Sequence, residues 1–206
     1  RVRRSEEALK KSLEEISILN SLGSKITSQL SLEPVIKMLY KELKSLLDSE
    51  TIYIGVYEED QDAIDFQLVM VNGKEQEWDN YYLDNSLMGY VLREKQSICV
   101  SSEEAARLLK NPLDPNLLTE AHYMIAPLTV SSKLIGILGV SNHSNANAFT
   151  AHDFKIFQTV THQASLAIRN AILYERTVRL ADNLSVINQS LQDGMSNLDR
   201  STSLEA

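Results

Sequence analysis

Apolar residues recur every three or four positions in two stretches at the start of the chain. In the first stretch, residues 5–30, Leu and Ile stand among Glu and Lys, as an amphipathic helix requires. In the second, Ser31 is a suitable N-cap, and Pro34 falls in the first turn of a helix that ends near Asp48. The chain is therefore predicted to begin with two helices.

The pattern then changes to alternation, which is typical of strands. Residues 51–73 alternate β-branched and aromatic residues on either side of an acidic turn, and this predicts a β-hairpin. Residues 123–142 form a second hairpin around the turn Ser131-Ser132-Lys133. Within that hairpin, Gly136 and Gly139 indicate positions where another group packs close to the backbone.

Short helices are predicted between the two hairpins. Residues 86–102 read as a helix followed by a strand centred on residues 98–100. Ser101 and Glu104 have the spacing of a capping box, which predicts a further short helix that ends before Pro112.

A second capping box, Thr150 and Asp153, begins a long helix with apolar positions from Phe154 to Ala171. From Leu173 onward the apolar spacing becomes a heptad repeat, which predicts a parallel dimeric coiled coil. The alternative is that this amphipathic helix packs only within its own domain. The residues expected at the coiled-coil interface are Leu173, Leu180, Leu184, Ile187, Leu191 and Leu198.

Composition narrows the class of protein. A net charge of -8 and a pI near 5.1 argue against nucleic acid or a membrane surface as the partner, because both attract basic surfaces. Cys99 is the one cysteine, so no disulfide forms within the chain, which fits the cytoplasm. The chain begins at Arg1 rather than Met, so we expect it to be a segment of a longer polypeptide.

Three segments carry a resemblance to a known family. SLMGYVLREKQSICV resembles the helix-then-strand segment of GAF domains, MIAPLTVSSKLIGILGVSN resembles their proline-containing hairpin, and AFTAHDFKIFQTVTHQASLAIRNAILYER resembles their closing helix. The order of elements over roughly residues 20–175 is similar to that of this PAS-like sensory fold. The sequence is therefore identified as a GAF domain held between two helices.

The resemblance implies an α+β fold. Its antiparallel sheet of five or six strands has the N- and C-terminal helices on one face and a ligand pocket under short helices and loops on the other. Combined with strand alternation, it places Ile52, Ile54 and Val56 against the helices. The residues that it places at the pocket are Tyr53, Tyr57, Phe66, Leu68, Tyr90, Tyr123 and Ile125.

Motifs for catalysis, metals and cofactors are weak or missing. The sequence has no phosphate loop, zinc-protease, nucleophile-elbow or dinucleotide motif, so we expect no enzyme activity. The four histidines have no metal-site spacing, and the acidic turn at 58–65 lacks the glycine and glutamate of an EF-hand loop. Among cofactors that relatives carry, a bilin on Cys99 or a haem on His122 or His143 is an open alternative. The cyclic-nucleotide motif of the family is not readable.

The predicted organisation has three parts: a dimerising helix at 1–20, the GAF domain at 21–175 and a coiled-coil linker at 176–206. We expect a sensory module of a sensor kinase, cyclase or similar signalling protein. It would be a homodimer that binds a small molecule and is covalently linked to an output domain. Two alternatives are a ligand-free GAF domain that serves as a dimerisation spacer and a haem- or chromophore-binding sensor.

Overall fold

The computed structural model describes residues 31–109 and 121–202. The predicted helix at 5–30, and with it the predicted dimerising segment at 1–20, lies outside these residues. The described elements are α2 (Leu32–Leu46), β1 (Thr51–Glu58), β2 (Ala63–Val71), β3 (Lys74–Glu75), β4 (Tyr81–Tyr82), α3 (Leu87–Glu94), β5 (Ile98–Ser101), α4 (Ser102–Leu109), β6 (His122–Val130), β7 (Lys133–Asn142) and α5 (Ala151–Thr202).

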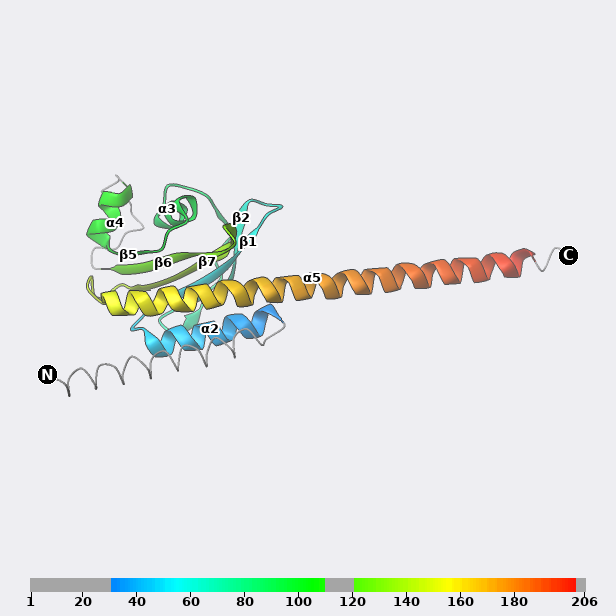
Figure 1. Cartoon of the computed structure of the whole chain (residues 1–206), viewed down its shortest axis with the longest axis horizontal. Coiled ribbons are helices and arrows are strands. Elements are labelled where there is room, and N and C mark those ends of the chain that lie inside the picture. Colours follow the sequence, from blue (N-terminus) through cyan, green and yellow to red (C-terminus); the bar gives the residue numbers. More distant parts are fainter. Residues whose placement is uncertain (1–30, 110–120, 203–206) are drawn as a thin grey trace.

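The strands form one antiparallel sheet in the order β3-β2-β1-β7-β6-β5, with β4 also paired to β2. Helices α2 and α5 lie on one face of this sheet, and α3 and α4 lie on the other (Figure 1). This arrangement confirms the predicted α+β fold. Over residues 31–109 and 121–202 the sheet has seven strands, two more than the long strands that the sequence predicts, because β3 and β4 are two-residue strands, too short to produce an alternating pattern.

A continuous apolar core joins α2 and α5 to the sheet. Ile52, Ile54 and Val56 of β1 lie in this core, on the face that alternation predicts. Phe157 of α5 is fully buried among them. Small side chains on α5 let the helix approach the strands closely; they are Ala164, Ala167 and Ala171, all fully buried.

The two predicted capping boxes form. At the start of α5, the Thr150 N–H donates to Asp153 Oδ2 at 2.8 Å, and the Asp153 N–H donates to Thr150 Oγ1 at 3.2 Å. At the start of α4, the Ser101 N–H donates to Glu104 Oε2 at 2.8 Å and the Glu104 N–H donates to Ser101 Oγ at 3.3 Å. Each box satisfies backbone donors that a helix N-terminus otherwise leaves unpaired.

Helix α2 is capped differently from the prediction. Ser31 occupies the N-cap position, but its side chain makes no capping hydrogen bond. Instead, the Leu32 N–H donates to Glu175 Oε1 at 2.9 Å, across from α5. A carboxylate is favourable at this end of a helix because of the helix dipole. The start of α2 is therefore tied to α5 near the point where α5 leaves the domain.

Candidate ligand-binding site

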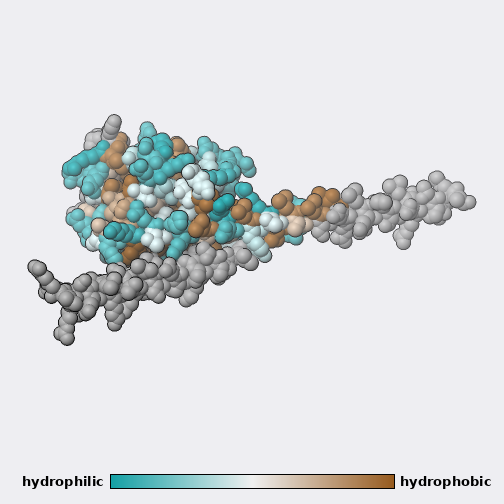
Figure 2. Space-filling view, in the orientation of Figure 1, coloured by the Kyte–Doolittle hydropathy of each residue, from teal (hydrophilic) through white to brown (hydrophobic). Residues whose placement is uncertain are grey.

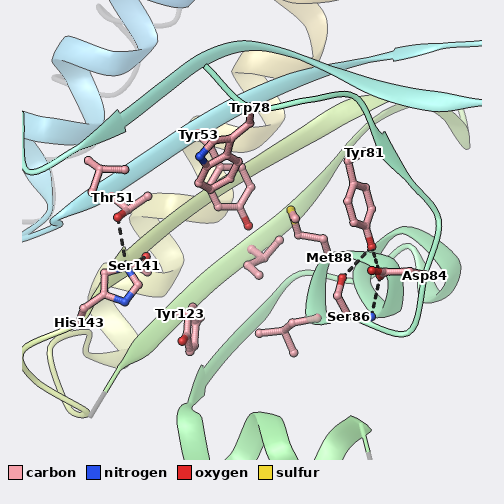
Figure 3. A pocket seen from close by; sticks show the side chains of 13 residues that line it. Thr51, Tyr53, Trp78, Tyr81, Asp84, Ser86, Met88, Tyr123, Ser141 and His143 are labelled. Carbon is pink, nitrogen blue, oxygen red and sulfur yellow. Dashed lines mark hydrogen bonds between the residues drawn. The ribbon is translucent and has the colours of Figure 1, made fainter. Parts of the chain in front are cut away.

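A cavity of about 500 Å³ lies on the sheet face opposite α2 and α5. Its floor consists of two rows of paired residues that run across the strands. One row is Thr51, Ser141 and Tyr123, and the other is Tyr53, Gly139 and Ile125. The remaining wall comes from the segment between β3 and α3 and from α3 itself (Figure 3).

Aromatic rings form one wall of the cavity. The ring centroids of Tyr53 and Trp78 lie 5.6 Å apart. Both rings pack edge-on against Phe66, with centroid distances of 5.9 Å for Tyr53 and 5.2 Å for Trp78. The ring of Tyr53 crosses directly over Gly139, where an added Cβ would lie 2.0 Å from Tyr53 Cζ. Glycine at 139 therefore gives the Tyr53 ring the space in which it lies, as the sequence indicated for this position.

A half-buried polar side chain, His143, closes one end of the cavity. His143 Nε2 lies 3.1 Å from Thr51 Oγ1 and 2.9 Å from Ser141 Oγ. The His143 N–H donates to Glu50 Oε2 at 2.8 Å, and the Ser144 hydroxyl donates to Glu50 Oε1 at 2.5 Å. These two hydrogen bonds lower the pKa of Glu50, so a carboxylate holds the backbone that carries His143.

The imidazole of His143 is not fully satisfied. Its Nδ1 is buried and has no hydrogen-bond partner among the described residues. Desolvation lowers the pKa of His143, and the charge of Glu50 offsets this in part. A neutral imidazole carries one proton, on either nitrogen. The Thr51 and Ser141 hydroxyls near Nε2 can both donate and accept, so they are compatible with a proton on Nε2 or on Nδ1.

Tyr81, Asp84 and Ser86 form the opposite end of the cavity. The Tyr81 hydroxyl donates to Asp84 Oδ1 and lies 2.6 Å from Ser86 Oγ, which accepts from the Gly89 N–H at 3.2 Å and so caps α3. Burial, followed by the hydrogen bond to Asp84, raises the pKa of Tyr81 to about 12. A Cβ at Gly89 would lie 2.1 Å from the Asp84 main-chain oxygen, so glycine lets this segment rest on α3.

The structure brings together three of the seven predicted pocket residues. Tyr53, Tyr123 and Ile125 line the cavity. Phe66 lies on the same face but behind Tyr53 and Trp78, where it supports the wall. Leu68 lies on the opposite face, in the core with α2 and α5. The reason is a register shift between β1 and β2 at Ile54/Gly55, which places one extra residue in β2 and reverses the alternation beyond it.

Tyr57 and Tyr90 were also predicted to line the pocket, but neither is among the residues that line this cavity. Tyr57 is on the expected face, but it lies at the hairpin end of β1, where its hydroxyl donates to Asp62 Oδ1 at 2.7 Å. Tyr90 is half-buried on α3, whereas Leu87 and Met88 are the α3 residues that line the cavity. Because successive residues of a helix point in different directions, Tyr90 projects from a different side of α3 than Leu87 and Met88 do.

Most of the polar lining was missed by sequence reasoning. Thr51 and Ser141 share the face of Tyr53 and Gly139 by alternation, so that signal was present in the sequence. Trp78, Tyr81, Asp84 and Met88 follow no alternation. The one available signal was that Trp78 is the only tryptophan of the chain.

Cys99 and His122 form a separate pair away from the cavity. Cys99 Sγ lies 3.6 Å from His122 Nε2, while His122 Nδ1 accepts from the Phe149 N–H at 3.1 Å. Burial raises the pKa of the Cys99 thiol to about 11, so the thiol stays protonated at neutral pH. Within residues 31–109 and 121–202, no group of three or more His, Cys, Asp or Glu side chains is placed to hold a metal ion.

Two histidines, His122 and His143, predict a specific pH dependence of stability. Desolvation lowers the pKa of both His122 and His143 below 6.5, so the unfolded chain binds these protons at a higher pH than the folded protein does. The contribution of these two histidines to stability is therefore fully present above pH 6.5 and is lost as the pH decreases below it. His143→Asn should reduce the shift of the urea midpoint between pH 6.5 and about pH 5. The control is His162→Asn on the exposed side of α5; an equal reduction by both variants would contradict the assignment.

The family model described as GAF domain matches residues 29–169, more than half of the chain, so the chain belongs to the GAF domain family. This match falls inside the range 21–175 predicted for the domain. GAF domains are typically sensory or regulatory parts of signalling proteins and are generally not catalytic. A search of curated protein sequences finds no match to this chain.

Solved structures of several kinds of protein share the fold. The GAF domain of an Acinetobacter phosphoenolpyruvate-protein phosphotransferase is 16% identical with a TM-score of 0.64, covering 78% of this chain and 95% of that one. The GAF domain of a two-component sensor histidine kinase from Bacillus halodurans is 17% identical with a TM-score of 0.55, covering 71% and 99%. Free methionine-R-sulfoxide reductase from Neisseria meningitidis, in complex with its substrate, is 12% identical with a TM-score of 0.61, covering 75% and 88%. Because the sequence identities are low, these structural similarities establish the fold and nothing further about this chain.

Among the helices of the described residues, none combines the length and apolar character that crossing a membrane requires.

Proposed function

We propose that this GAF domain is a sensory module that binds a small organic molecule in the cavity on its sheet. The observation that carries the proposal is the cavity itself. Its volume of about 500 Å³ falls within the range of small-molecule sites, and apolar walls with a few polar groups are typical of such sites. Polar groups stand at both ends, with His143 at one and Asp84 at the other.

The alternative of a ligand-free spacer requires the aromatic side chains to fill this space with one another. Tyr53, Phe66 and Trp78 instead pack together on one side, and Tyr123 lies against His143 with a ring distance of 6.1 Å. The volume between these two groups favours a ligand site over a spacer. Cys99 does not line the cavity, which weighs against a chromophore that is attached to this cysteine and bound in the cavity.

A regulatory rather than catalytic role is consistent with the chemistry of the lining. The reductase from Neisseria meningitidis has the same fold, but the one cysteine of this chain does not line the cavity and has a pKa raised to about 11 by burial. No thiolate is therefore available at the site for reduction of a substrate.

Contacts between the cavity and α2 provide a route for the signal. The residues that join α2 to β1 are bound to the His143 end of the site: Asn142 Nδ2 donates to the Asp48 main-chain oxygen at 3.1 Å, and Glu50 holds the backbone at His143. The other end of α2 is bound to Glu175 of α5. A ligand that binds one position of His143 better than another would therefore shift α2, and through it α5.

We further propose that α5 pairs with the same helix of a second copy and continues to an output domain outside this segment. Figure 2 shows hydrophobic surface on α5 where it leaves the domain. The predicted interface residues Leu173, Leu180, Leu184 and Ile187 are 48%, 63%, 61% and 54% exposed. Leu166, one heptad before Leu173, extends this apolar stripe onto the domain. Leu191 and Leu198 belong to α5, in a part where no side chains are described, and their role remains a prediction.

A thermal-shift screen tests ligand binding, followed by calorimetry on each compound that raises the melting temperature. The screen should include amines, amino acids, organic acids, nucleobases and cyclic nucleotides. A ligand present at a hundred times its dissociation constant stabilises the fold by about 2.7 kcal/mol, which such a screen detects.

Met88→Trp provides the matched variant, because Met88 lines the cavity from α3 and a larger ring occupies the ligand's space. We expect this variant to lose at least about tenfold in affinity for a compound that binds the wild type. Lys41→Trp, at an exposed position of α2 on the opposite face of the sheet, is the control. Unchanged binding by Met88→Trp would place the ligand elsewhere, and a screen without any hit would favour the spacer.

A further inference from the structure

The cavity presents aromatic faces and lacks positive charge. Tyr53, Trp78, Tyr81 and Tyr123 line it, and no lysine or arginine is among the described residues that do so. Burial lowers the pKa of His143, which keeps the ring neutral near pH 7. An anion in this cavity would lose its hydration without gaining a cationic partner, which is costly.

Asp84 supplies a carboxylate at the edge of the aromatic wall. Tyr81 and the Ser86 N–H, at 2.7 Å, both donate to Oδ1 of this exposed side chain. Burial acts to raise the pKa of Asp84, but the hydrogen bonds from Tyr81 and Ser86, together with the nearby charge of Arg93, outweigh it and lower the pKa, which keeps the group ionised. Arg93 donates to the main-chain oxygen of Asp84 and does not line the cavity.

We propose that the ligand of this cavity is a small organic cation, an amine or quaternary ammonium group on an apolar body, with its nitrogen at the Asp84 carboxylate and the adjoining aromatic rings. This inference rests on the proposed function, since it names the ligand class of the same cavity. The faces of Trp and Tyr rings attract cations, most strongly where water is excluded. The chain's net charge of -8 favours the approach of cations as well.

Trp78 makes this proposal directly measurable, because it is the only tryptophan of the chain and it lines the cavity. Its fluorescence would be titrated with three probes that share a phenyl body: 2-phenylethylamine, 2-phenylethanol and phenylacetate. These differ in charge at one end of the molecule. We expect the amine to bind about tenfold or more tightly than the alcohol and the carboxylate.

A charge-removing variant assigns the preference to Asp84. Asp84→Asn keeps an oxygen that accepts from Tyr81 and Ser86 while it removes the charge, and it should lower amine affinity about tenfold and leave the alcohol unchanged. The matched control is Asp79→Asn, because Asp79 is exposed on the same segment and does not line the cavity. Circular dichroism establishes that each variant is folded.

Two results would overturn the assignment of a cation. If phenylacetate or 2-phenylethanol binds as tightly as the amine, the cavity remains a ligand site, but of a different class. If Trp78 responds to none of the three probes in a folded protein, the cavity does not select cations. The thermal-shift screen then separates a wrong ligand class, in which other compounds bind, from failure of the proposed function itself.

Discussion

Replacing both Leu180 and Leu184 with aspartate is expected to convert the protein from a dimer to a monomer. Both side chains are more than half exposed on α5 in a single copy, at 63% and 61%. A parallel pairing would bury four leucines across the two helices, each contributing about 1.5–3 kcal/mol. Aspartate at these positions loses that burial and places like charges together. The dimer dissociation constant should rise by about 100-fold or more.

Sedimentation equilibrium measures this change directly. The control carries Val178→Asp and Ala181→Asp, which introduce the same two charges on neighbouring turns, at exposed positions off the apolar stripe. This control should stay dimeric. A wild-type protein that sediments as a monomer, or a Leu180→Asp, Leu184→Asp variant with unchanged mass, would contradict pairing through α5.

Gly139→Ala is expected to destabilise the fold by about 1–3 kcal/mol, because the added Cβ would lie 2.0 Å from the ring of Tyr53. Both residues are at the centre of the sheet, where the ring has little freedom to move: Tyr53 is 6% exposed and packs against Trp78 and Phe66. Urea denaturation measures the loss in free energy of unfolding. The variant should also bind less ligand, since the displaced ring enters the cavity.

A double-mutant cycle isolates this contact. In a Tyr53→Ala background there is no ring above residue 139, so Gly139→Ala should then cost little. A coupling energy of about 1 kcal/mol or more between the two sites is the expected result. An equal cost in both backgrounds would mean that the strain comes from another neighbour and that Gly139 does not make room for Tyr53.

The fold was predictable because its long elements carry strong periodic signals. Alternation on β1 assigned Ile52, Ile54 and Val56 to the helix side, and the capping box Thr150/Asp153 located the start of α5. Both signals depend on residues close in sequence. The cap of α2 did not follow from its sequence, because Glu175, more than a hundred residues away, replaces the side chain of Ser31.

The site was predictable where the strands keep their register. Tyr53, Tyr123 and Ile125 line the cavity as alternation requires, whereas the bulge in β2 moved Leu68 to the other face. The wall from Trp78 to Met88 has no periodic pattern. Its position depends on tertiary contacts, such as the approach of Asp84 to Gly89, that no local spacing encodes.

Binding of a small molecule in the cavity on the sheet can be followed through the emission of Trp78. Because Trp78 is the only tryptophan and lines that cavity, its fluorescence reports occupancy of this site alone. A compound selected by the thermal-shift screen should change the Trp78 emission saturably, with one ligand bound per chain. In calorimetry, the Met88→Trp variant should bind the same compound more weakly than the wild type does. A compound that raises the melting temperature while leaving Trp78 emission unchanged would contradict the claim.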